Sequence, residues 1–225
     1  MTDAKNKDKQ HTTCPFTKLK NSNFTACPFT NILIKEGHLH AKKEWSVKNM
    51  QDALKKIKMS SLASFLFANI FATPFITRNL KFSAKNINKH GIVEHDCSVS
   101  REDYCLGDHI NFSKKRFNLI YEYFPNKKYI TLKELTEYRY FLYQKSVREN
   151  PNVQIGISEV NIINGETCIL FILLSKNDKL SLKKMRHVFQ EETLDDLHIK
   201  SINVPNFFSS YIKFYLHWLN ASLQQ

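Results

Sequence analysis

The chain has 225 residues, of which 42% are hydrophobic, and a formal net charge of +12. This length suits one large domain or two small ones with a substantial core, and the composition excludes an intrinsically disordered chain. Its five glycines and six prolines are few. They disfavour an architecture of many tight turns and, with several stretches of helical period, favour an all-α fold.

The predicted elements form one domain after a polar start. Residues 1–24 are charged and without periodicity, which predicts a flexible N-terminal arm before a domain over residues 25–225. Helices are predicted from hydrophobic period and capping residues, in chain order over 28–35, 47–57, 61–72, 83–89, 131–150, 181–191 and 207–219. Residues 160–174 are apolar around a single acid.

The stretch 61–72 is apolar almost all round. We therefore expect a buried helix that ends before Pro74, because proline disfavours helix in the residue before it. Its phenylalanines, Phe65, Phe67 and Phe71, are expected to pack in the core, with the lining of an apolar access channel as the alternative.

The net charge, the number of cysteines and the length of the apolar stretches restrict the class of protein. The lysine excess lacks a dense basic block or RNA-binding motif, so we attribute it to solvated faces and expect no nucleic-acid partner. Five cysteines without a CxxC pair indicate neither a disulfide framework nor a zinc site. The start lacks the apolar core of a signal peptide, and the longest apolar stretch, 168–174, is too short to span a membrane. We therefore expect an intracellular protein, secreted only if this chain is a processed form.

Cys27 is followed directly by Pro28 at the start of a predicted helix. Proline suits the first helical position, where its missing N–H would be unpaired anyway. The cysteine then caps the helix, facing free backbone amides and the positive end of the helix dipole. Those donors favour thiolate over thiol, which suits a metal ligand. The same Cys-Pro-Phe-Thr sequence begins at Cys14, and the alternative for Cys27 is a buried, inert cysteine.

Glu94, His95, Asp96 and Ser98 form a compact polar cluster. Two carboxylates, a hydroxyl and nearby carbonyls suit a hard divalent cation such as Mg²⁺. The histidine could also orient a carboxylate or shuttle a proton. The alternative is a capped turn joined to Arg101 by ordinary surface ion pairs.

Glu166 is the single acid within the apolar residues 160–174. If this stretch is helical, the carboxylate shares a face with aliphatic side chains, where desolvation is costly and demands a partner or a function. Desolvation would also raise its pKa, as a general acid–base catalyst requires. The alternative is a glutamate at the start of a helix that points to water.

Together these motifs resemble the heme-thiolate peroxidase family that contains chloroperoxidase and the unspecific peroxygenases. The family's proximal pattern matches Cys27, Pro28, Asn31, Leu33, Gly37 and Leu39. Its Glu-His-Asp-x-Ser-x-Ser-Arg pattern matches Glu94, His95, Asp96, Ser98, Ser100 and Arg101. Weaker features follow at Gly107-Asp108, Asn111-Phe112, the segment 148–151 and Gly165-Glu166. The resemblance runs from about residue 26 to about residue 194 in the correct order.

The resemblance implies a single compact multi-helix domain enclosing heme b, with Cys27 as the axial thiolate ligand of the iron. Glu166 would be the distal acid–base that moves a proton between the oxygens of hydrogen peroxide, leaving a ferryl porphyrin radical. His95 would position Glu166. This use of histidine is the pattern of short members, since long members have an arginine where this chain has Glu159. Small organic substrates, or halides, would be oxygenated or oxidised.

The resemblance also implies a Mg²⁺ site. Glu94 and Ser98, with the carbonyl oxygen of His95 and a heme propionate, would hold the ion, and Asp96 would support the turn. Two other interpretations stay open. A non-catalytic heme-binding or heme-sensing protein would use both Cys14 and Cys27, and a basic nucleic-acid-binding protein would account for the charge alone. Substrate and oligomeric state are not readable from these motifs.

Overall fold

The computed structural model describes residues 25–153, 155–194, 197 and 199–224. The predicted N-terminal arm and Cys14 lie outside the described residues. The helices are α1 (Pro28–Lys35), α2 (Val47–Lys56), α3 (Ser61–Ala72), the 3₁₀ helix η1 (Thr73–Arg78), α4 (Ala84–Ile87), α5 (Lys114–Tyr123), α6 (Leu132–Glu149), α7 (Ile157–Leu174), α8 (Leu182–Glu191) and α9 (Val204–Leu223). The predicted all-α fold is confirmed.

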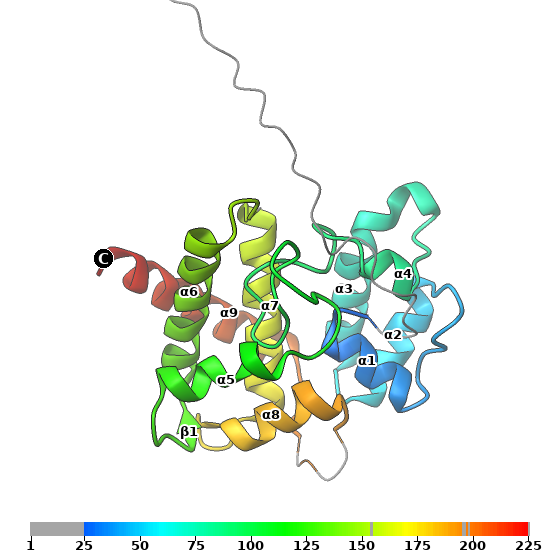
Figure 1. Cartoon of the computed structure of the whole chain (residues 1–225). Helices are drawn as coiled ribbons and strands as arrows, with labels where there is room; N and C mark the ends of the chain where they lie inside the picture. The colour runs from blue at the N-terminus through cyan, green and yellow to red at the C-terminus, as the bar shows by residue number, and fades with distance from the viewer. Residues whose placement is uncertain (1–24, 154, 195–196, 198, 225) are drawn as a thin grey trace, which may run out of the picture.

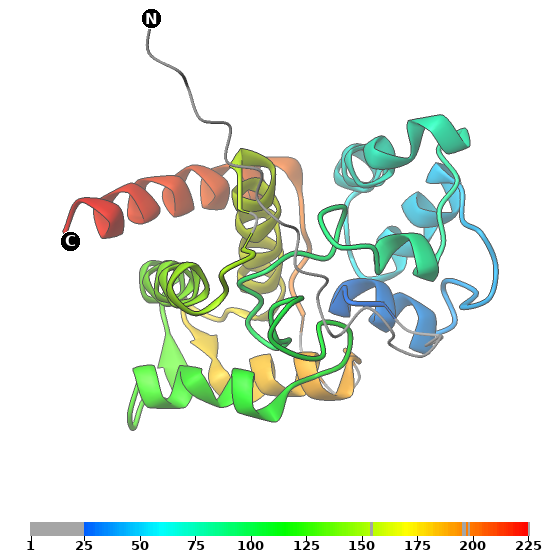
Figure 2. The same cartoon turned by 45° about the horizontal axis from the view of Figure 1, so that its top comes forward.

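The helices form two groups with a long loop between them (Figure 1 and Figure 2). Helices α1 to α4 lie on one side, where α2 packs on α3, and α5 to α9 lie on the other. Helix α7 lies in the middle of the second group and packs against α6, α8 and α9. Residues 88–113, between α4 and α5, cross between the groups. They contain the Glu-His-Asp motif, so the loop brings that motif to the centre of the molecule.

A two-stranded antiparallel sheet joins the starts of α6 and α8. Strand β1 (Tyr129–Ile130) pairs with β2 (Leu180–Ser181), with Tyr129 opposite Ser181. Both strands are too short for a layer of their own, and each leads directly into a helix. The pair therefore fixes the separation of α6 and α8 beside α7.

Local capping explains why several helices begin where they do. The Ser46 hydroxyl accepts from the Asn49 N–H, and Thr131 and Glu134 form the predicted capping box at α6. Helix α1 begins at Pro28, as predicted. Helix α5 was not predicted, because its apolar face is interrupted by charged residues. Its start is nevertheless capped, with the Ser113 hydroxyl accepting from the Arg116 N–H.

The prediction that residues 61–72 form a buried helix is wrong in part. Helix α3 has the predicted bounds, but Leu62, Phe65 and Ile70 are each more than half exposed. Its buried positions are small, among them Ala63 and Ala68. Small residues let α3 approach α2 closely, while its larger side chains turn away from that contact.

Helix α7 is the core helix of the second group. Its length and composition would also suit a membrane span, and within the described residues it is the one helix of which this holds. Half of α7 is buried in the protein. Phe214 and Trp218 attach α9 to it through contacts around Ile163 and Cys168. These contacts are those of a helix packed in a folded domain.

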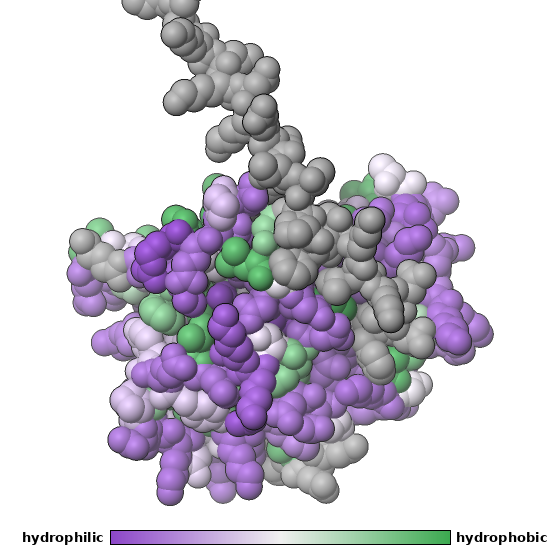
Figure 3. Space-filling view, in the orientation of Figure 1, coloured by the Kyte–Doolittle hydropathy of each residue, from purple (hydrophilic) through white to green (hydrophobic). Residues whose placement is uncertain are grey.

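The surface and the cysteines bear on two further predictions. The face drawn in Figure 3 is mainly hydrophilic, with small separate hydrophobic patches, as expected for lysines spread over solvated faces. Cys27, Cys97 and Cys168 are free and buried, whereas Cys105 is disulfide-bonded. The irregular spacing of the cysteines gave no indication of that bond.

Candidate active site

Cys27 occupies the N-cap of α1, and Pro28 follows at the first helical position, as predicted. The cysteine has extended backbone angles and is buried. Burial raises the pKa of the Cys27 thiol, as does nearby Glu166, while hydrogen bonds from the Thr30 hydroxyl and backbone N–H lower it. The expected amide donor is therefore present, but burial outweighs it. A bound metal cation would favour the thiolate again.

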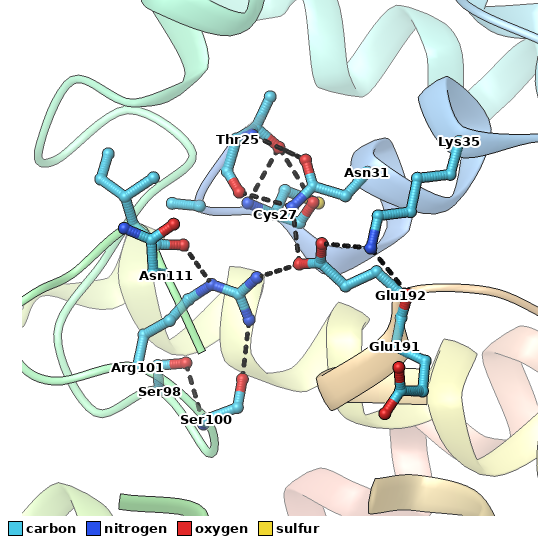
Figure 4. A network of polar contacts seen from close by, with 12 residues as sticks. Thr25, Cys27, Asn31, Lys35, Ser98, Ser100, Arg101, Asn111, Glu191 and Glu192 are labelled. Carbon is cyan, nitrogen blue, oxygen red and sulfur yellow. Dashed lines mark hydrogen bonds and ion pairs between the residues drawn. The ribbon is translucent and has the colours of Figure 1, made fainter. Parts of the chain in front are cut away.

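Asn31 ties the start of α1 to the rest of the molecule (Figure 4). Its Nδ2 donates to the Thr25 carbonyl at 2.7 Å and to Glu192 Oε1 at 2.6 Å, and its Oδ1 accepts from the Thr25 N–H at 2.6 Å. The Thr25 hydroxyl in turn accepts from the Cys27 N–H at 3.1 Å. Asn31 thus holds the turn that carries the cysteine.

Glu192 is the acid on which this network converges, and it was not predicted. Its Oε1 accepts from Arg101 Nη2 at 2.5 Å as well as from Asn31, and its Oε2 lies 3.5 Å from Lys35 Nζ. Glu192 follows α8 with a left-handed φ of 51°, a conformation that favours glycine. The available signal was an acidic pair, Glu191-Glu192, at a helix end where the dipole favours basic residues.

Arg101 is a buried member of the Glu-His-Asp motif, not part of a surface turn. Its Nε donates to the Ile110 carbonyl at 2.9 Å and its Nη1 to the Ser100 hydroxyl at 2.7 Å. Its Nη2 donates to Glu192 Oε1, so every nitrogen of this guanidinium has a hydrogen-bond partner. The alternative of ordinary surface ion pairs for this motif is therefore wrong.

Glu166 and His95 meet in the middle of the molecule. Glu166 comes from α7, and its Oε2 lies 3.3 Å from His95 Nε2. His95 Nδ1 lies 2.6 Å from the Asp96 carbonyl, to which it must donate. The contact between Nε2 and Oε2 therefore needs one further proton, carried by either group. This pair holds a proton that can move.

Electrostatics favour the charged form of this pair. Burial raises the pKa of Glu166, but the charge and hydrogen bond of His95, with Arg139, outweigh it and leave the pKa below its ordinary value. Burial lowers the pKa of His95, but Glu166 outweighs it and the pKa is raised. The expectation of a raised glutamate pKa is therefore wrong, because desolvation is not the only effect here. Glu166 is held as a carboxylate, ready to accept a proton.

Glu94, His95 and Ser98 face a common small cavity, together with Arg139 and Arg101. The buried Glu94 carboxylate lies 2.7 Å from His90 Nδ1, a partner that was not predicted. The oxygens of Glu94 and Ser98, with a nearby carbonyl, are the donor types that Mg²⁺ prefers. The residues present thus fit this ion. In the part of the chain that the structure describes, no cluster of three or more His, Cys, Asp or Glu side chains is arranged to hold a metal, so a Mg²⁺ site here would need the hydroxyl and carbonyl oxygens of the loop.

Asp96 and the segments after it support the loop. Asp96 accepts from the Tyr104 N–H at 2.9 Å and from Asn150 Nδ2 at 3.2 Å, which anchors the loop to the end of α6. Asp108 accepts from the backbone N–H groups of Ile110 and Asn111, each at 2.9 Å. These polar residues therefore explain how an irregular loop holds its shape.

The site opens into a cavity of about 550 Å³. Cys27 and Glu166 both line it, and the rest of its wall is largely apolar, including Phe67 and Phe71 of α3 and Phe207 of α9. The access-channel alternative is thus supported for Phe67 and Phe71 but not for exposed Phe65. A cavity of this size can take a flat, mostly apolar cofactor. The cysteine and the Glu166 carboxylate of the proton-holding pair reach the same space, so the residues fit a heme group.

Comparison with known families agrees with this arrangement. A family model described as "Peroxidase, family 2" matches residues 20–210. No curated protein matches the chain. The matched range includes the cysteine turn, the Glu-His-Asp loop and Glu166, and it extends beyond Glu192. The chain therefore belongs to family 2 of the peroxidases, the chloroperoxidase-like family.

Proposed function

We propose that this peroxidase is a heme-thiolate enzyme that uses hydrogen peroxide to oxygenate or oxidise small organic substrates. The observation that carries the proposal is the shared cavity. The Cys27 thiol and Glu166, which His95 contacts at 3.3 Å, line one largely apolar space of about 550 Å³. A helix-capping cysteine alone would be compatible with simple heme binding. A glutamate on the cavity wall that shares a mobile proton with buried His95 supports catalysis.

The residues have distinct roles in this proposal. Cys27 would hold the iron of heme b, and the bound group would supply cleavage of the peroxide O–O bond, which thiolate ligation favours. Glu166 Oε2 accepts a proton from one oxygen of hydrogen peroxide and returns it to the other oxygen, which leaves. His95, fixed by the Asp96 carbonyl, orients Glu166 and holds it ionised. The apolar wall excludes water and favours apolar substrates.

The oxygen-rich loop would hold Mg²⁺ beside the cofactor. Its ligands would be Glu94, Ser98 and the carbonyl oxygen of His95, with a heme propionate completing the set. The side chain of His95 faces Glu166, so a metal role would use its backbone only. A heme-sensing protein remains the alternative function, but it leaves the Glu166–His95 pair without a role.

The spectrum of the reduced carbon monoxide complex tests the proposal directly. After expression with heme supply, we expect a Soret band at the long-wavelength position of thiolate-ligated heme. Cys27→Ala should abolish that band, because it removes the sulfur that lines the cavity. Cys168→Ala, which removes another free and buried cysteine that lines neither cavity, is the control and should retain it, as should Cys14→Ala, which has the same local sequence as Cys27. A band that survives Cys27→Ala would refute the assignment of the ligand.

The pH dependence of kcat/KM tests the role of His95. Glu166 must be ionised to accept a proton, so activity is lost as the pH falls through the pKa of Glu166. His95 lowers that pKa, and His95→Gln removes its charge. We therefore expect the acidic limb of the pH profile to move to higher pH in His95→Gln. A limb that stays in place would show that His95 does not control the ionisation of Glu166.

A further inference from the structure

Arg139 is a buried arginine whose hydrogen-bonding capacity is only partly used. It comes from the middle of α6 and is 3% exposed. Among the residues that the structure describes, neither its Nε nor its Nη2 has a hydrogen-bond partner. The Glu166 carboxylate lies near, but its Oε2 is 3.7 Å from Nη2, which is too far for a hydrogen bond. Buried donors of a charged group without a partner are costly, so a missing ligand is the natural explanation.

The two free nitrogens of Arg139 define the chemistry of that ligand. Nε and Nη2 lie on the same edge of the guanidinium, where their two N–H bonds are parallel. This edge matches the two oxygens of a carboxylate and binds it with two hydrogen bonds. Glu166 is not free to fill the edge while it is paired with His95 at 3.3 Å. The edge is therefore suited to a carboxylate from outside the chain.

The position of Arg139 restricts which carboxylate can reach it. Arg139 lines a cavity of about 20 Å³, which has room for little more than one water-sized group. Cys27 and Glu166 line both this cavity and the large one. Only the terminal group of a molecule held in the large cavity fits here. Arg101 lines the same small cavity, but each of its three nitrogens already has a hydrogen-bond partner.

We propose that the Nε–Nη2 edge of Arg139 binds a propionate carboxylate of the bound heme, which makes Arg139 an anchoring residue for the cofactor. This inference rests on the proposed function, since it takes heme b as the occupant of the large cavity. Glu94 and Ser98 line the same small cavity. A propionate that enters it therefore meets Arg139 as well as the proposed Mg²⁺ ligands.

Heme titration of the cofactor-free protein tests the anchor without measuring activity. The association constants of heme b and of heme b dimethyl ester are measured from the Soret band at one fixed Mg²⁺ concentration. The ester has the same ring and iron but no carboxylate charge. Arg139→Leu should reduce the ratio of the two constants on the order of tenfold, the value of one charge-assisted pair. Arg139→Lys, which keeps charge but loses the fork, should give an intermediate ratio.

Two controls separate this role from others. Arg148→Leu removes an exposed arginine from the same helix and should leave the ratio unchanged. Glu166→Gln should not lower it, because this variant removes a negative charge 3.7 Å from Nη2 and leaves the edge itself intact. Circular dichroism verifies the fold of each variant, and the comparison of heme with its ester in the unmodified protein requires no substitution.

The heme titration distinguishes a wrong role for Arg139 from a wrong function for the protein. If heme b gives no thiolate spectrum with the unmodified protein, the proposed function falls. If the thiolate spectrum forms but the ratio is equal in Arg139→Leu and the unmodified protein, only the anchor is overturned. If the ratio falls in Glu166→Gln as much as in Arg139→Leu, the anchor is equally overturned, in favour of Arg139 acting on Glu166.

Discussion

Replacing Glu166 by glutamine is expected to leave heme binding intact and to lower peroxide turnover about 10²- to 10⁴-fold, the usual contribution of a positioned acid–base group. Glutamine has the same shape and still accepts a hydrogen bond from His95, so the packing of α7 should not change. It cannot accept the proton of hydrogen peroxide. The loss should therefore appear in turnover, with the Soret band unchanged.

The matched control is Glu159→Gln on the same helix. The Glu159 carboxylate accepts from the Gly156 N–H at 2.7 Å, which makes it part of the start of α7 and not of the cavity wall. This variant should turn over peroxide at the rate of the unmodified protein. Steady-state oxidation of a small phenol by hydrogen peroxide measures both variants. Unchanged turnover in Glu166→Gln would remove Glu166 from the mechanism.

Replacing Glu192 by alanine should lower the free energy of unfolding by about 3–5 kcal/mol, the cost of removing one partner of a buried ion pair. The variant leaves Arg101, which is 2% exposed, with an uncompensated charge. It also removes the acceptor of Asn31 Nδ2 beside the cysteine turn. Urea unfolding followed by circular dichroism measures the loss.

Glu191→Ala is the control for this prediction, because Glu191 is the exposed neighbour at the end of the same helix. It should change stability by no more than about 0.5 kcal/mol, as surface substitutions usually do. Glu192→Gln should fall between the two, since the amide oxygen still accepts from Asn31 but the charge opposite Arg101 is lost. Equal stability of Glu192→Ala and Glu191→Ala would contradict the role assigned to this network.

The sequence predicted the features that depend on neighbouring residues. Hydrophobic period and capping chemistry located most helices, because a cap such as Thr131–Glu134 is complete within four residues. The ordered motifs likewise predicted that Cys27, His95 and Glu166 belong to one site. The predictions that were wrong concerned the surroundings of a side chain in the fold. The exposed side chains of α3 and the lowered pKa of Glu166 depend on which elements pack nearby.

The residues missed by sequence reasoning act through distant partners. Glu192 meets Asn31 across 161 positions and Arg101 across 91, and no local pattern records either pair. Arg139 is one of several charged residues along α6 and is distinguished only by its burial beside Glu166. The bond between His90 and Glu94 lies within four residues, but a histidine outside a regular helix has no fixed partner. Such contacts require the folded chain.

The link between Asn31 and Glu192 also limits when the site can exist during protein synthesis. Cys27 leaves the ribosome long before Glu192. Until Glu192 emerges, Asn31 lacks one acceptor and Arg101 lacks its counter-charge. The cysteine turn then has its bonds to Thr25 and the bond from the Ala26 N–H to Asn88, but not its link to Glu192. A nascent chain or a fragment ending before α8 cannot present the complete cysteine pocket. Cofactor loading therefore requires both the start of α1 and the end of α8 to be in place at once.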